Sequence, residues 1–489
     1  MKIGKTDNSN GFRLGFYLIA LLFSLIPLSC NNDDKISEIE ETFRNPPEIS
    51  SSNGVLDTTL KVGFSEVMIG DKKVTTRVYN GSYVPPTLRV HPGDIIRLRL
   101  ENFIDQMTSL HFHGMNVTPI SPSDDIFIMV TPTGTFNYEI PIPRDHASGL
   151  DFYHPHLYGL TEFQIMSGMA GAIIVEGLLD PFPKLQGIRE LTMELKDIQI
   201  DPNGRVPMEM DVDEPSSPTI PTVNGLVNPV IKIHPGETQL WRIVNMGPDR
   251  YYLLKLDGHT FFEIARDGKR LNQIVPENEI LLPPSSRVEA LIQGGPAGAF
   301  YGFKTLPFNT GPEGDTYAGA MLATLLSDGP AEKPIPLPTK SEFPPLEDLC
   351  DPSELIAQKR TIVFSDGSDD STFFINGKTF DPSRVDTQVK IGTLEEWTLQ
   401  NTSKELHVFH IHQAYFQVCE INGVKQPFTG YQDTVNMPYL DEDPNKQGPG
   451  EVKIVINFRD PTIEGKFVYH CHIGEHEDHG MMAVIQAVK

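Results

Sequence analysis

Residues His470–His476 read HCHIGEH, and Met481 follows a few positions later. One short stretch thus supplies a thiol, three imidazoles and a thioether near the end of the chain. Two imidazoles, a thiolate and a weak axial thioether form the ligand set of a blue-copper site. The sequence therefore predicts a copper site that has Cys471 as a ligand.

The neighbours of that cysteine predict a second metal site close behind the first. Side chains alternate between the two faces of an extended strand. If residues 468–472 are extended, Cys471 lies on one face, and His470 and His472 lie on the other. The two imidazoles start roughly 7 Å apart along the backbone and can reach different ions. An electron that arrives at the sulfur is then only a few bonds from the next metals.

The length and charge of the chain restrict its class. With 489 residues, two to four domains are expected. The net charge of −25 argues against nucleic acid as a partner and is typical of a soluble, self-repelling surface. The same charge could also attract cationic substrates, although solubility is the simpler explanation.

Residues 1–30 have the pattern of a lipoprotein-type signal peptide. Basic residues precede an apolar run at 14–28, which is too short to span a membrane comfortably, and Cys30 follows it. Lipidation of Cys30 would attach an exported protein to a membrane, in the periplasm or at the outer membrane. An ordinary signal peptide and an uncleaved anchor are the alternatives. Residues 31–54 are expected to form a polar tether.

Two further cysteines, Cys350 and Cys419, have no assigned role. In an exported chain they could form one disulfide. Two unpaired buried thiols are an equally good interpretation, because a sequence does not give the distance between them.

A turn pattern occurs three times along the chain and predicts its domain organisation. In each copy an Asn-Gly pair precedes a run that alternates apolar and polar residues, and an Asn closes the run nine residues after a second glycine. The copies begin about 150 residues apart, which is the size of a domain. The three copies are Asn80-Gly81 with Gly93 and Asn102, Asn224-Gly225 with Gly236 and Asn245, and Asn376-Gly377 with Gly392 and Asn401.

This repeat predicts an all-β chain of three β-sandwich domains in tandem. Composition places the first domain at residues 55–178 and the second at 186–328. A proline-rich linker at 329–357 precedes the third domain, at 358–489.

Ten of the fifteen histidines fall in four short clusters. A His-X-His pair on a strand places both imidazoles on one face, which is the arrangement that bridging metals need. His407 has the opposite parity to His410 and His412 and should therefore face the copper held by Cys471. The clusters are His111 with His113; His154 with His156; His407 with His410 and His412; and His470 with His472 and His476.

With these motifs the chain resembles the multicopper oxidases, specifically three-domain bacterial laccase-like enzymes. The resemblance covers about residues 75–489 and rests on HFHG at 111–114, YHPH at 153–156, HVFHIH at 407–412 and the C-terminal cluster. It implies three cupredoxin domains with Greek-key topology and four coppers per chain. It further implies a mononuclear blue copper held by His407, Cys471, His476 and axial Met481.

The same resemblance implies a trinuclear copper cluster between the first and third domains. His111 and His410 would hold its lone copper. The coupled pair would be held by His113, His154, His156, His412, His470 and His472. Glu477 would deliver protons, and Asp124 or Asp125 would be the second such acid, unless both only solvate a loop.

Two departures from the family pattern lie next to these ligands. Val408 stands where many members have proline, and Gln413-Ala414 stands where many have Gly-His. Neither change removes a ligand. We expect both to reshape the rim of the blue copper site.

The reaction implied is the one-electron oxidation of small reductants coupled to the four-electron reduction of dioxygen to water. Phenols and related aromatics are the expected reductants, and the chain is expected to be a monomer. A metallo-oxidase of Cu(I) or Fe(II) in copper tolerance is the second hypothesis. A copper-binding or electron-transfer protein without oxygen chemistry is the third, and the eight histidines of the cluster argue against it.

Overall fold

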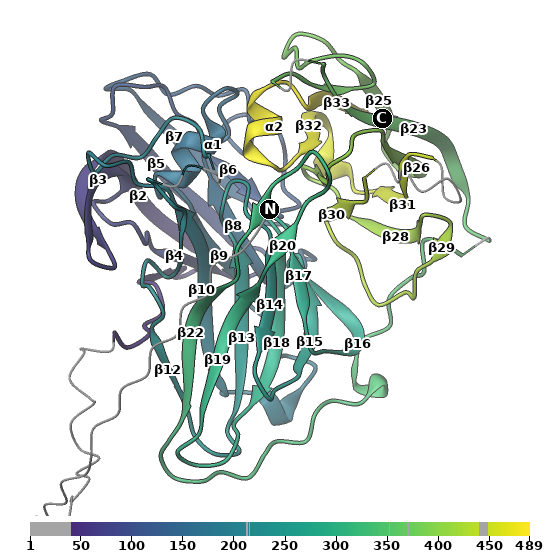
Figure 1. Ribbon diagram of the computed structural model, residues 1–489. Helices are drawn as coiled ribbons and strands as arrows, with labels where there is room; N and C mark the ends of the chain where they lie inside the picture. The colour runs from purple at the N-terminus through teal and green to yellow at the C-terminus, as the bar shows by residue number, and fades with distance from the viewer. Residues whose placement is uncertain (1–40, 212–213, 215, 352, 369–370, 440–447) are drawn as a thin grey trace, which may run out of the picture. The chain divides into compact units, whose positions relative to one another are not determined.

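The computed structural model describes residues 41–489 except 212–213, 215, 352, 369–370 and 440–447. The predicted signal peptide, with Cys30, and the first part of the tether lie outside the described residues. Strands dominate the fold and form three successive β-sandwiches (Figure 1). Within the described part of the chain, no helix is long and apolar enough to cross a membrane.

The first sandwich packs a four-stranded sheet against a five-stranded one, in the orders β3-β2-β5-β7 and β1-β4-β9-β8-β6. The bounds of the first sheet are β2 (Val55–Ile69), β3 (Lys72–Tyr79), β5 (Ile95–Asn102) and β7 (Thr135–Pro141). Those of the second are β1 (Glu48–Ser50), β4 (Thr87–Val90), β6 (His111–His113), β8 (Gly149–His154) and β9 (Gly171–Val175). The short helix α1 (Thr161–Met166) lies between β8 and β9.

The second sandwich has sheets in the orders β11-β10-β13-β18-β15-β16 and β12-β22-β19-β14-β17. Its first sheet comprises β10 (Arg189–Ile198), β11 (Ile220–Val223), β13 (Thr238–Asn245), β15 (Phe261–Arg266), β16 (Lys269–Glu277) and β18 (Arg287–Gln293). Its second comprises β12 (Val230–Ile233), β14 (Tyr252–Leu256), β17 (Ile280–Leu282), β19 (Phe300–Leu306) and β22 (Ala320–Ser327), beside the small pair β20 (Phe308–Asn309) and β21 (Thr316–Tyr317).

The third sandwich has sheets in the orders β24-β23-β26-β31-β28-β29 and β25-β33-β32-β27-β30. Its first sheet comprises β23 (Ile356–Asp366), β24 (Phe373–Ile375), β26 (Thr393–Asn401), β28 (Phe416–Ile421), β29 (Val424–Lys425) and β31 (Gly450–Phe458). Its second comprises β25 (Thr387–Lys390), β27 (His407–Ile411), β30 (Thr434–Met437), β32 (Gly465–Cys471) and β33 (Met482–Val488), with helix α2 (Gly474–Asp478) after β32.

The repeated sequence pattern forms the same structure in each sandwich. Each Asn-Gly pair is a tight turn in which both residues have positive φ, between 51° and 76°, the region that suits Asn and Gly best. Each closing Asn is buried and holds the loop that follows it through its own side chain. In the third domain, for example, Asn401 donates to the carbonyl of Glu405 and accepts from the N–H of Ser403.

The tether prediction is wrong for its second half. Phe43 is buried in the core of the second sandwich, and β1 pairs in parallel with β4. Burial of an aromatic ring and a row of strand hydrogen bonds hold this segment on the folded domains. The polar composition of this segment therefore gave no sign of the short strand β1. The rest of the expected tether, residues 31–40, lies outside the described part of the chain.

Cys350 and Cys419 form a disulfide. Of the two interpretations that the sequence left open, the structure selects the bridge. It joins the segment before β23 to β28 and so fastens the incoming chain to the third sandwich.

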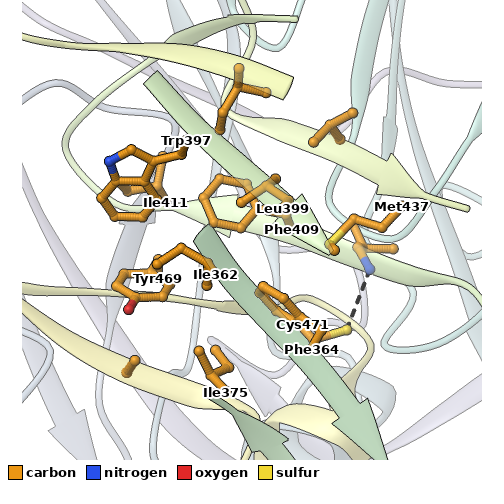
Figure 2. Packing of buried hydrophobic residues seen from close by; sticks show 14 of the residues in the cluster. Ile362, Phe364, Ile375, Trp397, Leu399, Phe409, Ile411, Met437, Tyr469 and Cys471 are labelled. Carbon is orange, nitrogen blue, oxygen red and sulfur yellow. Dashed lines mark hydrogen bonds between the residues drawn. The ribbon is translucent and has the colours of Figure 1, made fainter. Parts of the chain in front are cut away.

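The core of the third sandwich lies between its two sheets and contains Cys471 (Figure 2). Trp397, Phe409 and Tyr469 are fully buried there, beside the aliphatic side chains that Figure 2 labels. Cys471 is a free cysteine and is also fully buried. A thiol buried in an apolar core is a suitable sulfur ligand for a copper site.

Candidate metal centres

The first centre contains His407, Cys471 and His476, whose ligand atoms lie within 4.8 Å of one another. The sulfur of Cys471 is 3.8 Å from Nδ1 of His407 and 3.5 Å from Nδ1 of His476. The two Nδ1 atoms are 3.0 Å apart. These three side chains come from β27, the end of β32 and α2, so the third domain alone builds the centre.

Met481 and Val408 complete the surroundings of the sulfur. Met481 is buried in the same core cluster as Cys471, and its carbonyl accepts the N–H of Cys471 at 3.0 Å. The N–H of Val408 donates to Cys471 Sγ at 3.4 Å, and a dashed line ends on this sulfur in Figure 2. Met482 packs in a different cluster, against Ile126 of the first domain. The two consecutive methionines, which lie just before and at the start of β33, therefore pack in different clusters.

Acids behind both imidazoles orient them toward the sulfur. His407 Nε2 lies 3.2 Å from Asp366, and His476 Nε2 lies 3.3 Å from Glu405. In each ring Nε2 faces a carboxylate, which leaves Nδ1 for the centre. Burial alone would raise the pKa of Cys471, but the two histidines outweigh it and lower this pKa to about 6. A thiolate is the form of cysteine that binds a metal.

The second centre gathers eight histidines from the first and third domains. On β6 and β8, His111 lies opposite His154, and on β27 and β32, His410 lies opposite His470. Contacts join the two domains at the centre, including a 3.2 Å separation between the Nε2 atoms of His156 and His470. All eight side chains are buried: His111, His113, His154, His156, His410, His412, His470 and His472.

Strand alternation explains why these histidines meet on one side. In each His-X-His motif on a strand, the central residue enters its own domain core: Phe112 in the first domain, and Ile411 and Cys471 in the third. The flanking imidazoles face the domain interface. Cys471 thus occupies a core position in the first centre, while its two neighbours belong to the second.

The donors of the second centre fit metal binding. Among the described residues, one ring nitrogen each of His111, His154, His410 and His472 is buried without a hydrogen-bond partner. Burial lowers the pKa of His154, His410 and His472 well below the ordinary value, which keeps these rings neutral. Neutral imidazoles with unpaired, buried nitrogens are costly unless a metal ion satisfies them.

The three predicted acids differ in their contacts. Glu477 lies 3.1 Å from Nδ1 of His470 and 3.5 Å from Nδ1 of His156, so it connects two cluster rings. Asp124 is hydrogen-bonded to Nδ1 of His111 at 3.0 Å. Asp125 instead accepts the N–H of Phe127 and stabilises its own loop. Of the two candidate aspartates, the structure therefore brings only Asp124 to the cluster.

Three residues behind the cluster were not anticipated from the sequence. Asp433 and Arg287 lie behind His410, and neither belongs to a recognisable motif. Gln413 was expected at the rim of the first centre, but its side chain donates to Asp124 at 2.6 Å, behind the second. Its φ of 53° turns the chain away from the strand, which explains this different direction.

A cavity of about 470 Å³ opens beside His476. Its lining is strongly acidic, and the ring of His476 also stacks on Phe373 at a centroid distance of 4.2 Å. The acidic side chains that line it are Glu313, Asp315, Asp366, Glu405 and Glu475. His476, one of the three side chains of the first centre, thus forms part of the wall of this cavity.

Three consecutive sandwiches, a Cys-His-His centre and a buried histidine cluster together are typical of a copper protein. Three family models described as multicopper oxidase match residues 61–179, 200–325 and 356–489. The chain belongs to the multicopper oxidases, and its three domains are of the cupredoxin type. Membership in this family implies copper as the metal and an oxidoreductase activity.

Similar proteins cover nearly the whole chain. The multicopper oxidase mco of Staphylococcus haemolyticus is 27% identical over 90% of this chain and 91% of its own. The cell division protein FtsP of Edwardsiella tarda is 28% identical over 81% of this chain and 82% of its own. A solved multicopper oxidase of Campylobacter jejuni, described as a metallo-oxidase, is 25% identical with a TM-score of 0.76, covering 92% and 96% of the two chains.

Proposed function

We propose that this protein is an oxidase that couples one-electron oxidation of small reductants to the four-electron reduction of dioxygen to two waters. The position of Cys471 carries this proposal, because it lies in the first centre while His470 and His472 lie in the second. Copper bound at both centres would supply the one-electron redox chemistry and the binding of dioxygen. Four coppers per chain are expected.

The ligand assignment follows the family pattern, and the geometry supports it for the mononuclear site. His407, Cys471 and His476, with Met481 in the axial position, would hold the mononuclear copper. His111 and His410 would hold the lone copper of the cluster. The other six histidines would hold the coupled pair, and in one such set the ligand atoms of His156, His412 and His470 already lie within 4.8 Å of one another.

Protons for water formation would pass through two buried acids. Glu477 contacts His156 and His470, and it can hold a proton at its carboxylate beside the cluster. Burial alone would raise the pKa of Glu477, but His470 outweighs it and lowers the pKa, so this group is held as a carboxylate, the form that accepts a proton from a donor and passes it on. Asp124 is placed to do the same beside His111.

The cavity beside His476 favours a cationic reductant over a neutral phenol. Several carboxylates line this cavity, and Glu405 contacts the His476 ring directly. An acidic cavity raises the local concentration of cations and repels anions. This observation supports the metallo-oxidase hypothesis, with Cu(I) or Fe(II) as the reductant. A non-oxidase role, to which the likeness to FtsP draws attention, remains the competing class.

Oxygen uptake by the copper-loaded protein tests the proposal. Fe(II), Cu(I) and a phenol would each be supplied to the wild type and to Cys471→Ser. We expect uptake that requires Cys471 and is fastest with a metal ion. A protein that holds four coppers but consumes no oxygen would instead support electron transfer or copper handling.

The cavity is tested with two variants, Glu313→Gln and Glu405→Gln, and with the exposed, distant Glu139→Gln as control. We expect the KM for Fe(II) to rise about tenfold in the cavity variants at low salt, and to rise in the wild type as salt increases. Unchanged KM values in both cavity variants would restore phenols as the favoured reductants.

The proposed function also includes a cellular location and an oligomeric state for the chain. Export as a lipoprotein anchored through Cys30, in the periplasm or at the outer membrane, agrees with the apolar run before that residue. The protein is expected to act as a monomer. Mass spectrometry of the mature N-terminus would identify the lipid, and light scattering would measure the assembly.

A further inference from the structure

One side chain of the middle domain reaches the back of the histidine cluster, although all twelve proposed copper ligands lie in the first and third domains. Arg287, at the start of β18, is fully buried. Its two terminal nitrogens donate to the two carboxylate oxygens of Asp433 at 2.7 and 2.6 Å. One of these two nitrogens, Nη2, also donates to the carboxylate of Asp151 at 3.1 Å. Arg287 therefore joins the three domains at a single point.

The carboxylates around Arg287 stabilise its cationic form. Burial alone would lower the pKa of Arg287, but Asp433 and Asp267 outweigh it and keep the pKa above its ordinary value. Asp267 accepts the backbone N–H of Arg287 at 2.9 Å. The planar guanidinium can serve several carboxylates at once, which an ammonium group does less well.

Asp433 connects this cation to two cluster histidines. Its backbone carbonyl is hydrogen-bonded to Nδ1 of His410 at 2.9 Å. Nε2 of His410, which is buried and has no hydrogen-bond partner in the described part of the chain, is thereby left for a metal. The carboxylate itself lies 3.6 Å from Nε2 of His113.

The carboxylate of Asp433 is close enough to compete for the metal. Its oxygen and the ring nitrogens of His113 and His410 lie within 4.8 Å of one another. Because Arg287 contacts both carboxylate oxygens, it holds the group behind the imidazoles. Without Arg287, the carboxylate would be an unpaired buried charge beside the cluster, free to turn toward a cation.

We propose that Arg287 is a positioning residue for the lone copper: it fixes Asp433, which sets the orientation of His410 and stays outside the ligand set. This inference rests on the proposed function, since it assumes a copper on His111 and His410. It assigns to the middle domain a role in building the cluster. The site would accordingly depend on the assembly of all three domains.

The experiment compares Arg287→Met, Arg287→Lys and Asp433→Asn with Arg242→Met. Arg242 is the matched control, because it is equally buried in the same sheet and pairs with Glu289 and Glu190, none of which contacts a cluster histidine. Each copper-loaded protein would be measured for copper per chain, for blue absorption and for the electron paramagnetic resonance signal of the non-blue cupric ion.

We expect Arg287→Met to lower the affinity for the lone copper about 10- to 100-fold and to change the non-blue signal, with blue absorption retained. Arg287→Lys should restore part of the signal, and Arg242→Met should leave it unchanged. If Arg287→Met does not fold, the non-blue copper signal of Asp433→Asn tests the role of the Arg287–Asp433 pair instead. A wild-type level of copper and an unchanged signal in a folded variant would overturn the inference, whereas a wild type without four coppers would overturn the proposed function instead.

Discussion

The two centres differ in how the chain builds them. The Cys471 centre takes all its side chains from the third domain and lies against that domain's core. The cluster takes histidines from two domains and is held from behind by Arg287 of the middle one. The first is thus a product of one folded domain, whereas the second requires the domains to assemble. Variants and denaturants should therefore affect the two centres separately.

Replacement of Cys471 by Ser should have the largest effect. The change removes the thiolate, so we expect complete loss of blue absorption at about 600 nm and of oxygen uptake. The cluster histidines are unchanged, so the non-blue copper signal should remain. Absorption and electron paramagnetic resonance spectra would measure both outcomes.

Met482→Leu is the control for that variant, because Met482 packs in a separate cluster. It should keep the blue colour and the oxygen uptake. An intense band at about 600 nm in Cys471→Ser would show that the thiolate assignment is wrong.

Glu477→Gln should slow oxygen reduction by about 100-fold, the usual contribution of a positioned proton donor. The amide keeps the shape of the side chain but cannot carry the proton between His156 and His470. Anaerobic bleaching of the blue centre by a reductant should be unaffected, because that step needs only the first centre. Stopped-flow absorption and oxygen uptake would separate the two steps.

Asp125→Asn is the matched acid control, since Asp125 contacts its own loop rather than a histidine. It should retain both rates. Equal oxygen uptake in Glu477→Gln and the wild type would exclude Glu477 as the proton donor and leave Asp124 as the next candidate.

The sequence could predict whatever depends on local periodicity. The alternation of His470, Cys471 and His472 predicts two faces, and the structure places these residues on opposite sides of β32. The Asn-Gly repeat predicts three domains because each copy forms the same turn.

The residues that hold the cluster from behind could not be predicted in this way. Arg287 and Asp433 are 146 residues apart and meet only after three domains have packed together. Gln413 follows a ligand directly, yet its positive φ sends the side chain to Asp124. The short strand β1 also escaped prediction, because its pairing with β4 depends on a surface made by distant residues. Long-range packing, rather than local pattern, decided the positions of Arg287, Asp433 and β1.

Urea should remove the cluster before the blue centre. Separation of the domains disrupts fewer buried contacts than the unfolding of a sandwich, so it costs less free energy and should occur at a lower urea concentration. We expect the non-blue signal to disappear at a urea concentration about 0.5 M or more below that at which the blue absorption is lost. A titration followed by both spectra measures this difference. Coincident transitions would show that the first centre also depends on domain assembly.

The smallest expected effect concerns Val408, whose N–H donates to Cys471 Sγ at 3.4 Å. Val408→Pro removes this donor, whereas Val408→Ala keeps it and loses a similar part of the side-chain packing. A hydrogen bond to the sulfur reduces the electron density that it gives to copper and so raises the reduction potential. One such bond contributes about 1 kcal/mol, which corresponds to about 40 mV for a single electron. Redox titration of the blue band should therefore give a lower reduction potential for Val408→Pro than for Val408→Ala. Equal potentials would mean that the apolar surroundings of the sulfur alone set the reduction potential.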